Sequence, residues 1–371
     1  MRLFALKDYL IEHYPGDDTL WVTFDHAGLP KHPPEGRLGW AVPALVSQGW
    51  EVVAIKARAA DWFLRPEIAG FLQSKRFQRI LAGKRRVILY GLSMGGFGAM
   101  VYASLIPGSV VLAISPQTTL DPAKVPWEKR FDYALGENWT GPFGDVDARA
   151  PAHAEAYVLY SPKNRFDGPQ IDRLEQFRPI THLALRGNAH VPGGMLQESG
   201  LLKLVVQAVA AGPFSAEAFA GMDDVLMKSA AYHYHVAQEA EDTAEREAAL
   251  ERCLQLSSPY RIEFYRQRAA SLRMREASKA GDVLGVIDAL SQLRRCRAWH
   301  GSVTLKLMAL RFLLRTNAVD DADGVLREIS QDHPEGHPKL ADLAERVAEL
   351  QAAANVSVSA NVPNRDLNTA K

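Results

Sequence analysis

The sequence predicts an α/β fold followed by an all-helical region, and two observations carry this prediction. Up to about residue 212, short and nearly continuous apolar runs alternate with amphipathic stretches. This alternation is typical of strands and helices around a mostly parallel sheet that is covered on both faces. After Gly212-Pro213 it stops, and alanine, leucine, glutamate and arginine recur at helical spacing.

Six apolar runs are expected to form the strands of the sheet. Each run is too short for a helix and lies between polar, glycine or proline residues. About forty residues separate the fourth run from the fifth, so we expect a cap-like insertion at about 116–155. The six runs are residues 20–24, 51–55, 86–90, 109–114, 156–160 and 181–186.

The change in sequence pattern after residue 212 predicts where the domains divide. A chain of 371 residues is long enough for two or three domains. We expect an α/β domain over 1–212 and a helical domain over 213–354. The polar segment 355–371 has few large apolar groups, so we expect it to be disordered.

The helical half contains a weak internal similarity. Residues 321–334 carry apolar side chains in the spacing of the second helix of a tetratricopeptide repeat, and a segment from Ala280 parallels one from Ala318. The offset between these two segments is slightly longer than that repeat uses. The helical half therefore loosely resembles a tetratricopeptide-like array, and an unrelated helical bundle is the alternative.

The composition argues against several classes of function. The chain has 43 basic and 43 acidic residues, hence a formal net charge of zero, and no long basic run. We therefore expect no nucleic-acid partner. Cys253 and Cys296 lack the spacing of a metal site or a disulfide framework. Early charged residues argue against a signal peptide, and no apolar run reaches the ~20 residues of a membrane span, so we expect a cytoplasmic protein.

A candidate nucleophile follows the third apolar run. Residues 91–95 fit the pattern G-x-S-x-G with Ser93 at its centre. In that arrangement the serine occupies a strained turn between a strand and a helix, which lifts its Oγ above the sheet. Side chains two residues before and after would crowd the turn, so glycine is required at both positions. The alternative is a glycine-rich turn whose serine only caps the helix.

Histidine is the side chain whose pKa suits proton transfer near neutrality, and a serine hydroxyl needs such a base. His190 lies in the loop after the last predicted strand and far downstream of Ser93. This position makes His190 the expected general base. The other candidates, such as His26 and His182, are less well placed relative to the predicted strands.

An acidic residue should orient this histidine, and the loop after the run 156–160 should supply it. Asp167 is the expected acid, and Asp172, about one helical turn later, is the alternative. Asn164 stands closer to the end of the strand, where the carboxylate is often found. Asp167 could instead cap the helix that follows.

Two backbone N–H groups should form an oxyanion hole. One donor is expected at Met94 and the other around Asp25 and His26, after the first predicted strand. Trp62 and Trp127 are candidates for a substrate pocket. The aromatic residues of the insertion could equally form the core of a cap.

These residues together make the stretch 1–210 resemble the α/β-hydrolase superfamily. More narrowly, residues 91–96 with Ser115-Pro116-Gln117 and Asp121-Pro122 are similar to a group of small bacterial hydrolases. The resemblance implies a serine nucleophile, an acyl-enzyme intermediate, and no metal or organic cofactor. The lipase-type His-Gly-Gly signature is absent after the first strand.

The sequence therefore favours a serine hydrolase that cleaves a carboxylic ester or thioester of a small molecule or glycan. An acyltransferase would use the same residues and differ only in the acceptor, so the sequence leaves this reaction open. A non-catalytic hydrolase-like scaffold is the third reading, in which the helical half binds a partner protein.

Overall fold

The computed structural model describes residues 1–146, 155–175, 180–185, 193–333, 338 and 340–360. The chain divides into two compact units, one ending at Glu241 and the other beginning at Asp242. The boundary predicted from the sequence lies at 212, and the short helices between these two positions belong to the first unit. Among the described residues, no helix combines the length and the apolar character needed to cross a membrane.

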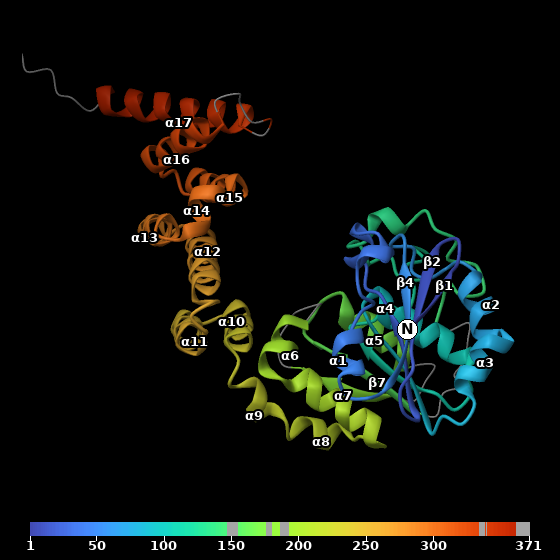
Figure 1. Ribbon diagram of the computed structural model, residues 1–371. Helices are drawn as coiled ribbons and strands as arrows, with labels where there is room; N and C mark the ends of the chain where they lie inside the picture. Colours follow the sequence, from blue (N-terminus) through green and yellow to red (C-terminus); the bar gives the residue numbers. More distant parts are fainter. Residues whose placement is uncertain (147–154, 176–179, 186–192, 334–337, 339, 361–371) are drawn as a thin grey trace, which may run out of the picture. The chain divides into compact units, whose positions relative to one another are not determined.

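A mostly parallel sheet forms the centre of the first unit (Figure 1). Its strand order in the described residues is β1-β2-β4-β3-β5-β6-β7-β8. Among these strands, only β2 runs in the direction opposite to the others. The strands are β1 (Arg2–Ala5), β2 (Tyr9–Tyr14), β3 (Thr19–Phe24), β4 (Glu51–Ala57), β5 (Arg86–Leu92), β6 (Val110–Ile114), β7 (Glu155–Tyr160) and β8 (Thr181–Ala184).

The six predicted strands correspond to β3 to β8, and the sequence prediction missed β1 and β2 at the edge of the sheet. Polar residues inside β2 hide its strand character. Glu12 is buried because it accepts a hydrogen bond of 2.7 Å from the fully buried Lys56 of β4. His13 is buried against Glu51 at 2.8 Å. Both partners lie on β4, so only the folded sheet explains this pattern.

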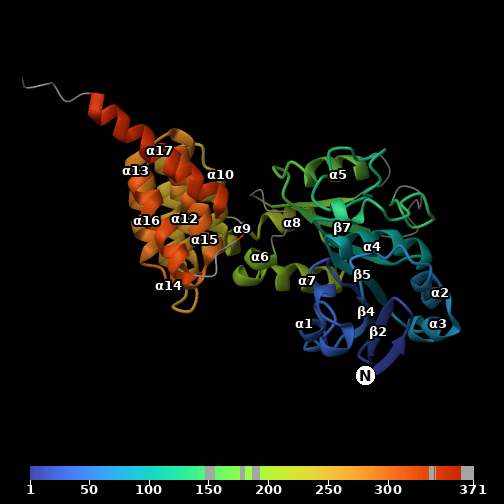
Figure 2. The same cartoon turned by 90° about the horizontal axis from the view of Figure 1, so that it is seen from above.

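Helices cover both faces of the sheet (Figure 2). α1 and α7 lie on one face, where they form a cavity with Tyr90 of β5. α2, α3, α4 and α5 lie on the other face and share one apolar core with the sheet. The helices are α1 (Val42–Val46), α2 (Glu67–Gln73), α3 (Lys75–Leu81), α4 (Met94–Tyr102), α5 (Asp167–Glu175), α6 (Gly193–Ser199), α7 (Leu201–Ala211), α8 (Ala216–Ala220), α9 (Asp223–Leu226) and α10 (Ala230–Glu239).

The predicted insertion is the irregular chain between β6 and β7, of which residues 147–154 lie outside the described part. Its aromatic residues Trp139 and Phe143 are buried in the main core of the first unit. The insertion therefore packs down onto the sheet and its helices through its own apolar side chains.

The second unit is helical in its described part. α12 pairs with α13 and α15 pairs with α16, so the unit contains two helical hairpins whose first helices also touch. The segments from Ala280 and Ala318 that resemble each other each precede the second helix of a hairpin. The helices are α11 (Thr243–Leu256), α12 (Ile262–Ala280), α13 (Val283–Arg294), α14 (Arg297–Gly301), α15 (Val303–Arg315), α16 (Val319–Asp332) and α17 (Ala341–Ala360).

The end of α17 corrects one expectation. The predicted disordered tail begins at residue 355, but the helix continues to Ala360. The rest of that predicted tail, residues 361–371, lies outside the described residues. The residues that extend the helix, 355–360, include only one strong helix former, so helix propensity does not explain the extension.

Candidate active site

Ser93 occupies the single residue between the end of β5 and the start of α4. Its backbone has φ 53° and ψ −116°, outside the regions that a residue with a Cβ adopts easily. The Ser93 N–H donates to the carbonyl of Ile114 on β6 at 2.8 Å, which holds this turn against the neighbouring strand. Residues with strained backbones cluster at active sites, and the strained residue here is the predicted nucleophile, Ser93.

We call the strained turn at residues 91–95 the elbow. Close contact between backbone segments requires glycine at its positions 91 and 95. A Cβ on Gly91 would lie 2.0 Å from the carbonyl carbon of Gly95. A Cβ on Gly95 would lie 2.4 Å from the carbonyl oxygen of Phe24 on β3. The first turn of α4 therefore rests directly on the backbone of two strands. This packing holds the Ser93 elbow at the carboxyl edge of the sheet.

The backbone around the elbow bears on the predicted oxyanion hole. Met94 is the first residue of α4, so its N–H has no acceptor within the helix. The N–H of Asp25 donates to the carbonyl of Ile55 at 3.3 Å and extends the sheet. This bond already uses the Asp25 N–H, which makes Asp25 the weaker of the two predicted donors. Of the two residues proposed there, His26 is the better candidate.

Asp25 has a structural role instead. Its carboxylate is buried and accepts hydrogen bonds from Arg37 at 2.6 Å and from the N–H of Ala57 at 3.0 Å. Burial raises the pKa of the Asp25 carboxyl, and the Arg37 guanidinium opposes this shift. These bonds fix the loop after β3 to the end of β4. They hold the segment that carries His26.

His26 stabilises its own loop. Its Nδ1 accepts a hydrogen bond of 3.1 Å from the N–H of Gly28, so the ring must be unprotonated at that nitrogen. Burial lowers the pKa of His26, although the nearby charge of Asp25 acts in the opposite direction. The loop is therefore built around a neutral imidazole.

Gln117 contacts the candidate nucleophile, and sequence reasoning did not assign it a role. The Ser93 hydroxyl donates to Gln117 Oε1 at 3.2 Å, and Gln117 Nε2 donates to the carbonyl of Ser115 at 3.2 Å. Gln117 is fully buried. It follows β6, the strand beside β5, so its position at the same edge of the sheet is the signal that could have identified it.

Asp167, the predicted acid, is the first residue of α5 and is fully buried. Its Oδ1 accepts a hydrogen bond of 2.8 Å from Arg130 Nη1, which comes from the insertion after β6. Asn164 Oδ1 accepts hydrogen bonds from the N–H groups of Phe166 and Asp167, so Asn164 caps the turn that leads into α5. Asn164 therefore orients the chain at Asp167.

Arg130 joins two buried carboxylates. It donates to Glu128 through Nε at 2.8 Å and to Asp167 through Nη1, and its guanidinium lies 4.8 Å from the centre of the Phe166 ring. Burial alone would lower the pKa of the Arg130 guanidinium, but Glu128 and Asp167 reverse this and raise it. Arg130 is therefore a permanent cation beside Asp167. Arg130 and Asp167 are 37 positions apart in the sequence, so no local sequence pattern could have identified their pairing.

The structure describes one of the two remaining predicted catalytic residues. Asp172, the alternative acid, is exposed and lies within α5. Asp167 is fully buried at the start of α5, and its role as the acid stays a prediction. His190, the predicted general base, lies outside the described residues.

Trp62, proposed for the substrate pocket, is fully buried. Its ring lies 4.9 Å from that of Phe131 and 6.2 Å from that of Trp139, both in the insertion. Trp62 and Phe63 have φ values of 53° and 57°, and the Tyr102 hydroxyl donates to the Phe63 carbonyl at 2.6 Å. In this structure Trp62 therefore serves as a core residue beneath the insertion.

Trp127, the other pocket candidate, is half-buried, and its Nε1 is buried without a hydrogen-bond partner among the described residues. No group of three or more histidine, cysteine, aspartate or glutamate side chains that could bind a metal ion occurs in the described part of the chain.

The strand order, the helices on both faces and the strained serine between β5 and α4 together decide the fold. The first unit has the α/β-hydrolase fold. Residues 53–157, which run from β4 into β7, match the model of a family described as "Putative esterase". This match supports ester hydrolysis as the class of reaction. No curated protein matches the chain.

Several solved structures are similar to this α/β-hydrolase unit. The capsule O-acetyltransferase of Neisseria meningitidis serogroup A is 15% identical, with a TM-score of 0.42 over 55% of this chain and 93% of that one. A carboxylesterase of the archaeon Nitrososphaera gargenis is 12% identical, with a TM-score of 0.38 over 57% and 99% of the two chains. An esterase of Thermogutta terrifontis is 14% identical, with a TM-score of 0.38 over 54% and 86%.

The elbow contacts predict the effect of adding one methyl group. Gly95→Ala should reduce the free energy of unfolding by about 3 kcal/mol or more, because the new Cβ collides with backbone that cannot move independently. Gly70→Ala is the matched control, since Gly70 lies on α2 with open space around it and should gain up to about 1 kcal/mol. Urea denaturation of both variants measures the difference, and equal stabilities would contradict the packing of α4.

The neutral His26 predicts a pH dependence of stability. Above about pH 6.5 the imidazole is neutral in both the folded and unfolded states. Below that value the unfolded chain binds the proton first, because folding lowers the pKa of His26. The free energy of unfolding should therefore decrease as the pH is lowered below about 6.5. Asn in place of His26 can accept the same Gly28 bond without titrating.

The comparison is therefore wild type against His26→Asn, by urea denaturation at about pH 7.5 and about pH 5.5. The variant should lose less stability than wild type over this range. An identical loss in both proteins would show that His26 does not contribute to the acid sensitivity.

Proposed function

We propose that the first unit is a serine hydrolase that cleaves a carboxylic ester or thioester of a small molecule or glycan. Ser93 Oγ attacks the carbonyl carbon while His190 accepts the hydroxyl proton and passes it to the leaving alcohol or thiol. Water then attacks the resulting acyl-enzyme and releases the acid, with His190 again moving the proton. Asp167 orients His190 and stabilises its protonated form.

The observation that carries this proposal is the strained backbone of Ser93 at the carboxyl edge of the sheet. A serine that only capped the helix would accept a hydrogen bond from a backbone N–H of the first turn, and the Ser93 side chain makes no such bond. The Met94 N–H beside it is available to stabilise an oxyanion. The esterase family match over the same residues supports the same chemistry.

The environment of Asp167 supports its role as the acid. A buried carboxylate is costly unless it is paired, and Arg130 supplies the compensating charge at 2.8 Å. Because Glu128 also pairs with Arg130, the three groups carry one net negative charge. The role proposed for Asp167, stabilising a protonated His190, requires such a net negative charge.

Acyl transfer is the second candidate, because an acyl-enzyme at Ser93 can be attacked by an alcohol instead of water. The two reactions share every step up to the acyl-enzyme. One of the similar structures is that of a capsule O-acetyltransferase, an enzyme that transfers an acyl group. Adding sugars or alcohols to the assay separates the two, since a transferase forms the acylated acceptor faster than the free acid.

Labelling with a fluorophosphonate tests the nucleophile directly. The wild-type protein should be labelled, and Ser93→Ala should lose both labelling and the hydrolysis of p-nitrophenyl esters, by roughly 10⁴-fold in kcat/KM. Ser161→Ala is the control, because Ser161 is another buried serine that directly follows a strand, β7, and it should react as wild type does. Absence of labelling in folded wild-type protein would favour a non-catalytic scaffold.

Removing the cation beside Asp167 should change the pH profile. In Arg130→Met, Glu128 and Asp167 are two buried carboxylates without their shared cation, so the acidic limb of kcat/KM should move to higher pH. Stability should fall by about 3–5 kcal/mol. In Glu128→Gln/Arg130→Met the second negative charge is absent, so both effects should be smaller. An unchanged pH profile in a folded Arg130→Met protein would contradict the role of Asp167.

A further inference from the structure

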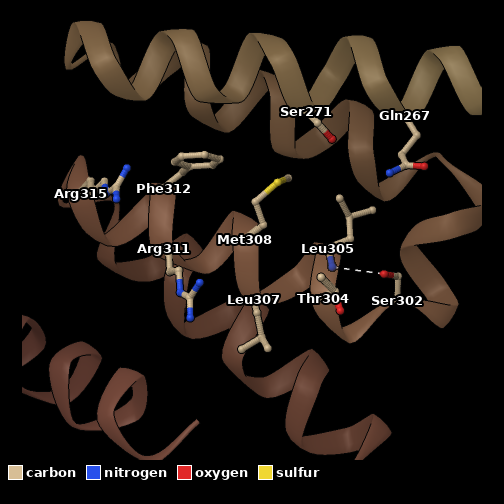
Figure 3. A pocket seen from close by; sticks show the side chains of 10 residues that line it. All are labelled: Gln267, Ser271, Ser302, Thr304, Leu305, Leu307, Met308, Arg311, Phe312 and Arg315. Atoms are coloured by element: carbon tan, nitrogen blue, oxygen red, sulfur yellow. Dashed lines mark hydrogen bonds between the residues drawn. The ribbon is translucent and has the colours of Figure 1, made fainter. Parts of the chain in front are cut away.

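The second unit contains a cavity of about 630 Å³ between α12 and α15 (Figure 3). Met308 and Phe312 extend from α15 toward α12, and Gln267 and Ser271 extend from α12 toward α15. Pockets that hold drug-sized ligands measure about 300–1,000 Å³. The cavity is therefore large enough for a short stretch of peptide but not for a folded domain.

Two arginines at this cavity lack acidic partners. Arg311 and Arg315 are one turn apart on α15, both are exposed, and neither forms an ion pair within the described residues. The Arg315 guanidinium lies 5.7 Å from the centre of the Phe312 ring. These two positive charges therefore remain available to a ligand.

Several other cations of the same unit form ion pairs within it. Residues 262–315 carry eleven lysines and arginines but only four acidic residues, and acids from neighbouring segments compensate several of the cations. Arg273 pairs with Glu247, and Lys306 pairs with Asp332 at 2.5 Å. Arg311 and Arg315 differ from these two cations because they form no such pair within the described residues.

The cavity also offers apolar surface and hydrogen-bonding groups. Leu305, Met308 and Phe312 contribute apolar lining from α15. On the opposite wall, the Ser271 hydroxyl is buried without a hydrogen-bond partner among the described residues, and Gln267 presents an amide. A buried hydroxyl without a partner is costly, and an incoming backbone carbonyl or N–H would satisfy it.

We propose that this cavity binds a short acidic segment of a partner protein. Aspartate or glutamate side chains of the segment pair with Arg311 and Arg315, while its apolar side chains pack on Met308 and Phe312. Gln267 and Ser271 bond its backbone. The apolar lining favours a peptide over a nucleic acid, because phosphate backbones are held mainly by basic and polar groups. This inference does not depend on the reaction of the first unit.

Fluorescence anisotropy of a labelled peptide of alternating glutamate and leucine, titrated with the full chain, tests the proposal. The peptide should bind, a lysine–leucine peptide should not, and about 0.5 M salt should weaken binding several-fold. Arg311→Gln/Arg315→Gln should weaken binding about tenfold or more. Arg327→Gln/Arg346→Gln removes two arginines of α16 and α17 that lie outside the cavity lining, and it should change binding less than about twofold.

Ser271→Phe supplies a second test, since it fills the cavity without changing any charge. It should weaken peptide binding to the same degree while the far-ultraviolet circular dichroism stays that of wild type. Equal binding by wild type and Arg311→Gln/Arg315→Gln would overturn the proposal. So would binding of single-stranded DNA in preference to the peptide, or a dimer in sedimentation that the same double variant disperses.

Discussion

The contact between the first turn of α4 and the backbones of β3 and β5 is the constraint on which the catalytic proposal depends. Gly91 and Gly95 allow this approach because neither has a Cβ. The close contact leaves only Ser93 to connect strand and helix, so its backbone is forced to φ 53°. Strain at that residue is offset by the packing of a fully buried helix. Replacing either glycine would act on the serine through this contact.

The strand pattern and the elbow could be predicted because both depend on local sequence. Apolar runs identify β3 to β8, and the glycine spacing identifies Ser93. β2 could not be found in this way, since Glu12 and His13 are compatible with a buried strand only through Lys56 and Glu51. The same limit explains why Arg130 was missed. Its partner Asp167 lies 37 positions away, and neither residue's neighbours indicate the other.

The insertion after β6 contributes to the candidate site as well as to the core. Trp139 and Phe143 fix it to the apolar interior, and Arg130 then brings a positive charge to the start of α5. Aromatic packing thereby determines the position of a guanidinium that compensates two buried carboxylates. The environment of the acid is thus controlled by a segment that supplies no residue of the proposed triad.

Ion pairs compensate cations in both units, and the whole chain is formally neutral. In the first unit, buried cations are matched within the fold, as Lys56 is by Glu12 and Arg37 by Asp25. In the second unit, Arg311 and Arg315 stay unmatched beside apolar surface and a buried hydroxyl. Single charges scattered on a surface contribute little to the affinity for one ligand, because water and salt screen them. Two arginines that line the same cavity can both contribute to binding one acidic ligand.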